Sequence, residues 1–328
     1  MKTSRLLLLT TAAMAFAHTA TANDALKVVT SIKPLYSLAT ALTAGTETET
    51  TLLVKGAASP HTYSMTPSEA RALQNADVVF WIGPSLEHFL EKPLDALASN
   101  GQVVELEEAP GVETLAPREG GAFEAHDDHD HEGHADEDHD EHADHEAGHE
   151  ENHHHEEVDP HMWLDPLNAK AFAAAMAETL SDSDPANAAI YAGNAEKLDD
   201  RLDALTADIQ AQIDAVAPKP YVVFHDAYHY FGHRFGVEAA GAITVNPEAP
   251  PSAQRVREIH DKLIELGAAC VFSEPQFPPK IIDTVIEGTD TRTGILDPLG
   301  AGLEDGPDLY FLLLENLAGN LTDCFVAG

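Results

Sequence analysis

Short apolar runs alternate with amphipathic stretches along the first part of the chain. The run at residues 77–82, DVVFWI, is almost continuously apolar, as in a strand of a parallel sheet that is covered on both faces. Helical periodicity over residues 66–75, with Pro67 in the first turn, precedes this run. Companion strands are predicted at residues 26–31, 50–54 and 102–106. This alternation predicts an α/β lobe with a mostly parallel sheet.

The same alternation returns in the last third of the chain. Strands are predicted at residues 221–224, 238–243, 268–273 and 293–296. Helices are predicted at residues 226–235, 252–266, 278–287 and 307–325. These elements predict a second α/β lobe, and two such lobes leave a cleft between them.

A long helical pattern separates the two alternating regions. It covers residues 185–216 and contains no proline after its first residue. Its repeating apolar face consists of Ile190, Leu198, Leu202, Leu205, Ile209 and Ile213. With a rise of about 1.5 Å per residue, such a helix would be roughly 45 Å long, which suits a connection between two lobes. Two shorter helices that break at Gly193 are the alternative.

The first residues predict a secretory signal peptide. Lys2 and Arg5 precede the apolar run 6–17, and the small residues 20–22 form a cleavage site, so the mature chain should begin at Asn23. A first helix that anchors the protein in a membrane is the alternative. No later segment has the roughly 18 uncharged apolar residues that a membrane span needs, so we expect a soluble exported protein. The predicted units are a signal peptide (1–22), an N-terminal lobe (23–184), a connecting helix (185–217) and a C-terminal lobe (218–328).

The charge of the chain limits the partners that it can have. The formal net charge is -38, from 56 acidic residues against 18 lysines and arginines. Such an excess of negative charge repels nucleic acid and anionic lipid and attracts cations. We therefore expect no nucleic-acid partner.

One segment concentrates histidine and acid. Residues 124–157 hold 11 of the 19 histidines and 16 acidic residues, with no lysine or arginine. The segment has almost no apolar side chains to bury, so we expect a disordered loop. Neutral imidazole binds zinc, copper and nickel, so weak auxiliary metal binding is predicted, and an inert acidic spacer is the alternative. The auxiliary ligands would be His126, His129, His131, His134, His139, His142, His145, His149, His153, His154 and His155.

The chain has two cysteines, Cys270 and Cys324, which are 54 residues apart. In an oxidising compartment such a pair predicts a disulfide, and two buried free thiols are the alternative. Neither cysteine has the spacing of a thiolate metal site.

Metal-binding side chains follow several predicted strands. His61 follows the second strand and its turn, His225 comes directly after residues 221–224, and Asp297 follows residues 293–296. His161 lies where the histidine-rich segment rejoins the first lobe. Ligands of open α/β sheets bind beyond the carboxyl ends of the strands, so these four side chains are predicted to converge on the cleft between the lobes. Three imidazoles and one carboxylate suit tetrahedral Zn²⁺ better than manganese or magnesium.

Two further histidines stand at regular spacing after the third ligand. His225, His229 and His233 are four residues apart and would line one face of a helix. A second metal site is one interpretation, and exposed helical positions for His229 and His233 are the other.

The same residues lie in motifs that resemble the zinc-specific solute-binding proteins of bacterial zinc ABC importers. The matching stretches are SIKPLYSL, PHTYSMTPSEARALQNADVVFWIGPSLE, DPHMWLDP, VVFHDAYHYFG, TVNPE, CVFSEPQF and GILDPLG. The resemblance covers nearly the whole mature chain. It implies two α/β lobes, a long connecting helix, a zinc ion in the cleft, and a Cys270–Cys324 disulfide.

The resemblance also implies ligand roles for individual residues. His61, His161 and His225 match zinc ligands, and the position of His225 is a glutamate in manganese-binding relatives. Asp297 matches a position that is a ligand in some relatives and is replaced by water in some zinc-binding members. Pro60 stands where some zinc-binding members carry a further glutamate ligand.

These observations predict a monomeric periplasmic protein that captures Zn²⁺ with high affinity and delivers it to the inner-membrane permease of a zinc ABC transporter. A periplasmic zinc buffer without a transporter is one alternative. A zinc hydrolase is the other, since zinc lowers the pKa of bound water. The chain has no HExxH motif, and nothing ties Asp297 or Glu274 to a substrate as a general base, so we expect no enzymatic activity.

Overall fold

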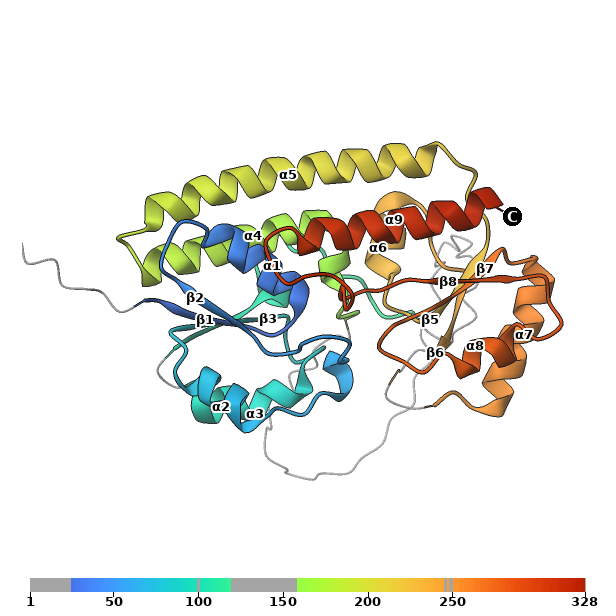
Figure 1. Cartoon of the computed structure of the whole chain (residues 1–328), viewed down its shortest axis with the longest axis horizontal. Helices are drawn as coiled ribbons and strands as arrows, with labels where there is room; N and C mark the ends of the chain where they lie inside the picture. Colours follow the sequence, from blue (N-terminus) through green and yellow to red (C-terminus); the bar gives the residue numbers. More distant parts are fainter. Residues whose placement is uncertain (1–24, 99–100, 119–157, 245–246, 248–249, 328) are drawn as a thin grey trace, which may run out of the picture.

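The computed structural model describes residues 25–98, 101–118, 158–244, 247 and 250–327. The predicted signal peptide and the histidine-rich segment with all its candidate auxiliary ligands lie outside these ranges. In the described part, two parallel sheets with helices on both faces lie side by side, and a long helix runs along both (Figure 1). The two predicted α/β lobes are thereby confirmed.

The N-terminal lobe contains a four-stranded parallel sheet in the order β2-β1-β3-β4. The strands are β1 (Lys27–Thr30), β2 (Glu49–Leu52), β3 (Val78–Trp81) and β4 (Gln102–Glu105). All four residues of β3 are buried, because its alternate side chains face helices on opposite sides. Helices α1 (Lys33–Leu42) and α4 (Pro166–Ser183) cover one face, and α2 (Pro67–Gln74) and α3 (His88–Leu97) cover the other.

The C-terminal lobe repeats this plan with the strand order β6-β5-β7-β8. The strands are β5 (Tyr221–His225), β6 (Gly241–Thr244), β7 (Cys270–Ser273) and β8 (Arg292–Ile295). Helices α7 (Ala253–Leu266) and α8 (Lys280–Val285) pack on one face, and α6 (His229–Phe235) and α9 (Leu309–Ala327) pack on the other. A disulfide joins Cys270 at the start of β7 to Cys324 in α9, which confirms the predicted pair.

The connecting helix α5 covers Ala188–Asp214, 27 residues without a break at Gly193. Its length is roughly 40 Å at the usual rise of an α-helix. It lies against α4 and α9, which belong to different lobes (Figure 1). The apolar positions predicted for its inner face are buried, with the exception of Ile190, which is 38% exposed.

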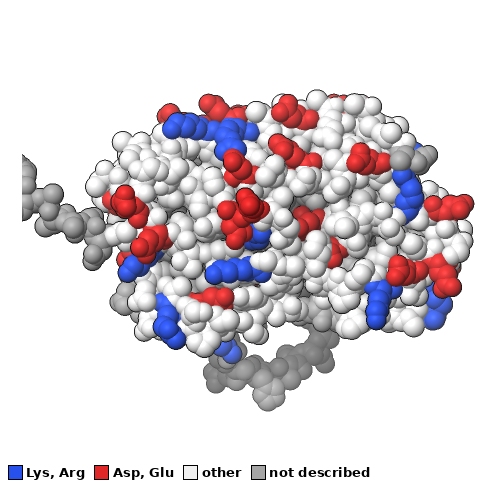
Figure 2. Space-filling model, viewed as in Figure 1, with Lys and Arg blue, Asp and Glu red and all other residues white. Residues whose placement is uncertain are grey.

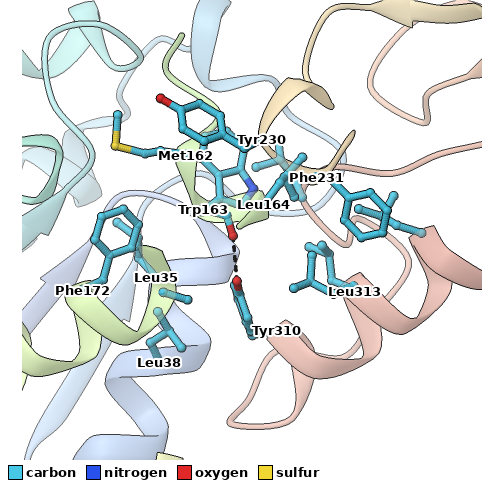
Figure 3. Close-up of a cluster of buried hydrophobic side chains, with 14 of the residues drawn as sticks. Leu35, Leu38, Met162, Trp163, Leu164, Phe172, Tyr230, Phe231, Tyr310 and Leu313 are labelled. Atoms are coloured by element: carbon cyan, nitrogen blue, oxygen red, sulfur yellow. Dashed lines mark hydrogen bonds between the residues drawn. The ribbon is translucent and has the colours of Figure 1, made fainter. Parts of the chain in front are cut away.

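A buried cluster joins the two lobes (Figure 3). The indole nitrogen of Trp163 donates a hydrogen bond to the carbonyl oxygen of Pro298 (2.8 Å), and the hydroxyl of Tyr310 donates one to the carbonyl oxygen of Trp163 (2.8 Å). The ammonium group of Lys33, only 4% exposed, donates to the carbonyl oxygens of Gly300 (2.7 Å) and Leu303 (2.9 Å). These bonds hold the loop after β8 against the N-terminal lobe.

On the face shown in Figure 2, acidic side chains are scattered over both lobes, and basic side chains are interspersed among them. None of the helices in the described ranges is both long and apolar enough to cross a membrane.

Candidate metal centre

Three histidines from three separate segments meet between the lobes. His61 lies in the short helix η1 (Pro60–Thr62) after β2, His161 precedes the short helix η3 (Met162–Leu164), and His225 is the last residue of β5. The Nε2 atom of His161 lies 3.2 Å from Nε2 of His61 and 3.1 Å from Nε2 of His225. Ligand atoms of all three lie within 4.8 Å of one another, and no other group of this kind occurs among the described residues.

The two shorter separations are close to the edge length of a zinc coordination tetrahedron. Nitrogen ligands at about 2.0–2.1 Å from Zn²⁺ are about 3.3 Å apart when the geometry is tetrahedral. The two short separations between Nε2 atoms are therefore close to what one ion would require. Zinc binds histidine nitrogens well, whereas hard cations such as Mg²⁺ and Ca²⁺ prefer oxygen ligands.

A different local structure places each imidazole. Pro60 occupies the first turn of η1, where its fixed φ is compatible with helix, and His61 follows at once. His161 is buried beside Trp163, with ring centroids 5.3 Å apart. Strand β5 is buried over its whole length. His225, its last residue, therefore lies at the carboxyl edge of the sheet inside the protein.

A carboxylate stands behind two of the three imidazoles. Nδ1 of His161 donates to Oδ1 of Asp159 (2.8 Å), and Nδ1 of His225 donates to the carboxylate of Glu274 (2.7 and 2.8 Å). Each bond places the ring proton on Nδ1 and leaves the lone pair of Nε2 directed at the centre. Glu274 is well placed because it directly follows β7, the hydrogen-bonded neighbour of β5.

The surroundings shift the pKa values of His61 and His225 in opposite directions. Burial and the neighbouring His161 and His225 lower the pKa of His61 to about 2, so its ring is neutral and available as a ligand at any physiological pH. Burial also lowers the pKa of His225, but the Glu274 carboxylate outweighs burial and leaves that pKa raised. Burial would raise the pKa of Asp159, yet His161 beside it holds that pKa below its usual range. The two carboxylates behind the rings of His161 and His225 complement a dication.

The fourth predicted ligand lies elsewhere. Asp297 is not part of the three-histidine group, because β8, which it follows, is two strands away from β5, roughly 10 Å at the usual strand spacing. Its carboxylate instead accepts backbone N–H bonds from Leu299 (3.1 Å), Gly300 (3.0 Å) and Ala301 (2.6 Å). In the structure this carboxylate organises the turn after β8.

The regularly spaced histidines do not share a helix. His225 ends a strand, and α6 begins only at His229, so the three rings cannot line one helical face. His229 faces Asp159, with 3.6 Å between Nδ1 and Oδ2, while the side chain of His233 is 48% exposed. The interpretation as a second three-histidine site is therefore wrong. The expected exposed positions are confirmed for His233 alone, because only 14% of the His229 side chain is exposed.

Sequence reasoning did not assign roles to Asp159 and Glu274. The signal for Glu274 was the same as for the histidines, since it directly follows a predicted strand. The signal for Asp159 was its place two residues before His161. At this spacing, both the backbone N–H and the ring of His161 can reach the Asp159 carboxylate.

Comparisons with known proteins agree on one family. The family model described as "Zinc-uptake complex component A periplasmic" matches residues 28–324. The high-affinity zinc uptake system protein ZnuA of Brucella abortus is 53% identical over 304 residues, which cover 90% of this chain and 91% of the relative. The protein of the same name from Yersinia pestis is 39% identical over 302 residues and 90% of each chain.

Solved structures share the fold at lower identity. A crystal structure of ZnuA has a TM-score of 0.74 at 22% identity, covering 92% of this chain and 100% of that one. A zinc-bound deletion mutant of ZnuA has a TM-score of 0.69 at 23% identity, covering 92% and 98%. At this identity, the likeness establishes the two-lobed architecture alone.

Proposed function

The chain belongs to the family of periplasmic components of zinc-uptake complexes, and we propose that it captures Zn²⁺ with His61, His161 and His225 and delivers it to a membrane permease. The observation that carries the assignment of these residues is the convergence of their ring nitrogens within 4.8 Å between the two lobes. The relatives that share 39% to 53% of its residues are named as high-affinity zinc uptake proteins.

The surroundings of the three rings suit tight capture. The cavity around them is also lined by Trp163, Phe277 and Leu299, whose apolar surfaces reduce contact with water. A low local dielectric strengthens the attraction between the ion and the carboxylates behind the rings. Because buried hydrogen bonds to Asp159 and Glu274 already hold the rings of His161 and His225, these two rings lose little conformational entropy when the ion binds.

Zinc transport explains the site better than zinc hydrolysis does. Asp159 and Glu274 both accept hydrogen bonds from ligand rings, which is the role of a group that orients a ligand. A hydrolase would need a carboxylate directed at a zinc-bound water instead. The remaining alternative, a zinc buffer without a transporter, predicts that deleting the gene leaves zinc uptake by the cell unchanged.

Deletion of residues 125–156 should leave one tightly bound zinc ion and remove only weaker ions. The three proposed ligands lie in the described part of the chain, outside this segment. The segment's composition predicts no packed core, so its histidines would have to lose chain entropy on binding. Titration calorimetry of the deleted and full-length proteins measures both stoichiometry and affinity. The control replaces the segment with a glycine–serine linker of equal length. Loss of the tight site in both variants would mean that the segment supplies a primary ligand.

The site should bind Zn²⁺ more tightly than Mn²⁺, and His225→Glu should narrow the difference. Three nitrogen ligands favour zinc, and a carboxylate at position 225 would add the oxygen donor that manganese prefers. The new carboxylate would face Glu274, so the matched variant His225→Glu with Glu274→Gln removes that repulsion. Competition between the two metals gives the ratio of affinities. Equal affinities in the unaltered protein would contradict the proposed ligand set.

A further inference from the structure

Gln276 lines the cavity that contains the three histidines, and only one of the two polar atoms of its amide has a hydrogen-bond partner within the described part of the chain. It belongs to the segment after β7 and lines the same cavity as His61, His161 and His225. Its Nε2 donates a hydrogen bond to Oδ1 of Asp297 (2.8 Å). Its Oε1 is buried and has no hydrogen-bond partner among the described residues.

The chemistry of the partner fixes which way this amide faces. A carboxylate only accepts hydrogen bonds, so the amide must present its NH₂ group to Asp297 and its oxygen elsewhere. Asp297 cannot turn away easily, because three backbone N–H groups of residues 299–301 hold its carboxylate. The orientation of Gln276 is therefore set by the turn after β8. Burying an amide oxygen without a hydrogen-bond donor destabilises the protein. A bound molecule that donates a hydrogen bond to this oxygen would remove that penalty.

Three histidine nitrogens leave one corner of a zinc tetrahedron open to another ligand. We propose that Gln276 Oε1 accepts a hydrogen bond from a water molecule at that corner, and that Asp297 is the positioning residue that holds the amide for this task. This inference rests on the proposed three-histidine zinc site. It gives Asp297 a role at the centre without contact with the metal.

The proposal has a consequence for the chemical class of the fourth ligand. An amide oxygen attracts a ligand that carries a hydrogen-bond donor and repels an anion without one. The wall at Gln276 therefore selects water over small anions such as thiocyanate. The zinc ion would then carry a neutral ligand that exchanges readily, which suits a cargo that must be handed on.

The test compares Gln276→Leu and Gln276→Met with the unaltered full-length protein. Both variants lose the acceptor and keep a side chain of similar size. Zinc affinity, measured by competition with a chelator, should fall about ten-fold, as for other groups that support a metal ligand. In the Co²⁺-loaded variants, thiocyanate should bind several-fold more tightly, as followed by the visible spectrum of the cobalt ion. Gln254→Leu is the matched control, because Gln254 makes the same amide–carboxylate bond, to Glu258, on an exposed helix.

Each result decides the question. An unchanged thiocyanate affinity in both variants would overturn the proposal even where zinc affinity falls, because a loosened cavity weakens zinc without favouring anions. Thermal unfolding of the metal-free variants shows whether the fold is kept. Failure of the zinc site itself would be seen differently, as an unaltered protein that binds no zinc in stoichiometric amount.

Discussion

Replacing His161 with alanine should weaken zinc binding by about 100-fold or more. The binding free energy of a protein site with four zinc ligands is about 10–16 kcal/mol, or about 3 kcal/mol for each ligand. A loss of about 3 kcal/mol corresponds to a change in affinity of about 100-fold. His161 is the central ring of the three, with its Nε2 within 3.2 Å of both others. Its loss would also remove the ring whose Nδ1 donates to the buried Asp159 carboxylate, which would keep His229 as its imidazole neighbour. The lost ligand atom sets the direction of the change, because the Asp159 carboxylate attracts the cation with or without a ring in front of it.

The measurement is a competition titration against a chelator of known zinc affinity. His88→Ala is the matched control, because His88 lies on α3 with a side chain that is 66% exposed. Circular dichroism of both variants shows whether the fold is kept. A zinc affinity of the His161→Ala protein equal to that of the control would contradict the proposed ligand set.

The fold and the three histidines could be predicted because their signals are local. Apolar runs that alternate with helical periodicity mark strands and helices one segment at a time, and all eight predicted strands are present within a few residues of their predicted bounds. The rule that ligands follow the strands then selected His61 and His225. His161 was found by a different signal, its place where the chain returns to the first lobe.

The same rule failed to separate Asp297 from Glu274, because strand order is not a local property. Both residues follow a strand of the second lobe, and the sequence alone does not say which strand lies next to β5. In the structure β7 is that neighbour, so Glu274 reaches His225, while β8 is one strand further away and Asp297 remains in the turn that it organises. Knowledge of the order β6-β5-β7-β8 would have been sufficient to assign both roles.

The contacts between the lobes were equally out of reach. Lys33 bonds to carbonyl oxygens more than 260 residues away, and Trp163 bonds to Pro298 across 135 residues. No periodicity connects such positions. They matter for function, because they hold the loop after β8, and with it Leu299, against the cavity that contains the three histidines.

Replacing both Cys270 and Cys324 with alanine should lower the free energy of unfolding by about 4 kcal/mol, from the chain entropy of a loop of this length. The disulfide closes 54 residues, and both cysteines are at least 95% buried, so alanine avoids placing a new polar group in the core. Zinc affinity should change little. Cys270 begins β7, whereas Glu274 and the proposed ligand His225 lie at the opposite, carboxyl ends of β7 and β5.

Urea unfolding of the metal-free proteins measures the free energy of unfolding, and chelator competition measures the zinc affinity. The metal must be absent from the unfolding experiment, because bound zinc would stabilise both folded forms and obscure the difference. An unchanged unfolding midpoint would contradict the predicted contribution of the disulfide to stability. A zinc affinity that falls with the stability would mean that the disulfide positions the carboxyl end of the sheet, because strain at one end of β7 would then reach Glu274 at the other.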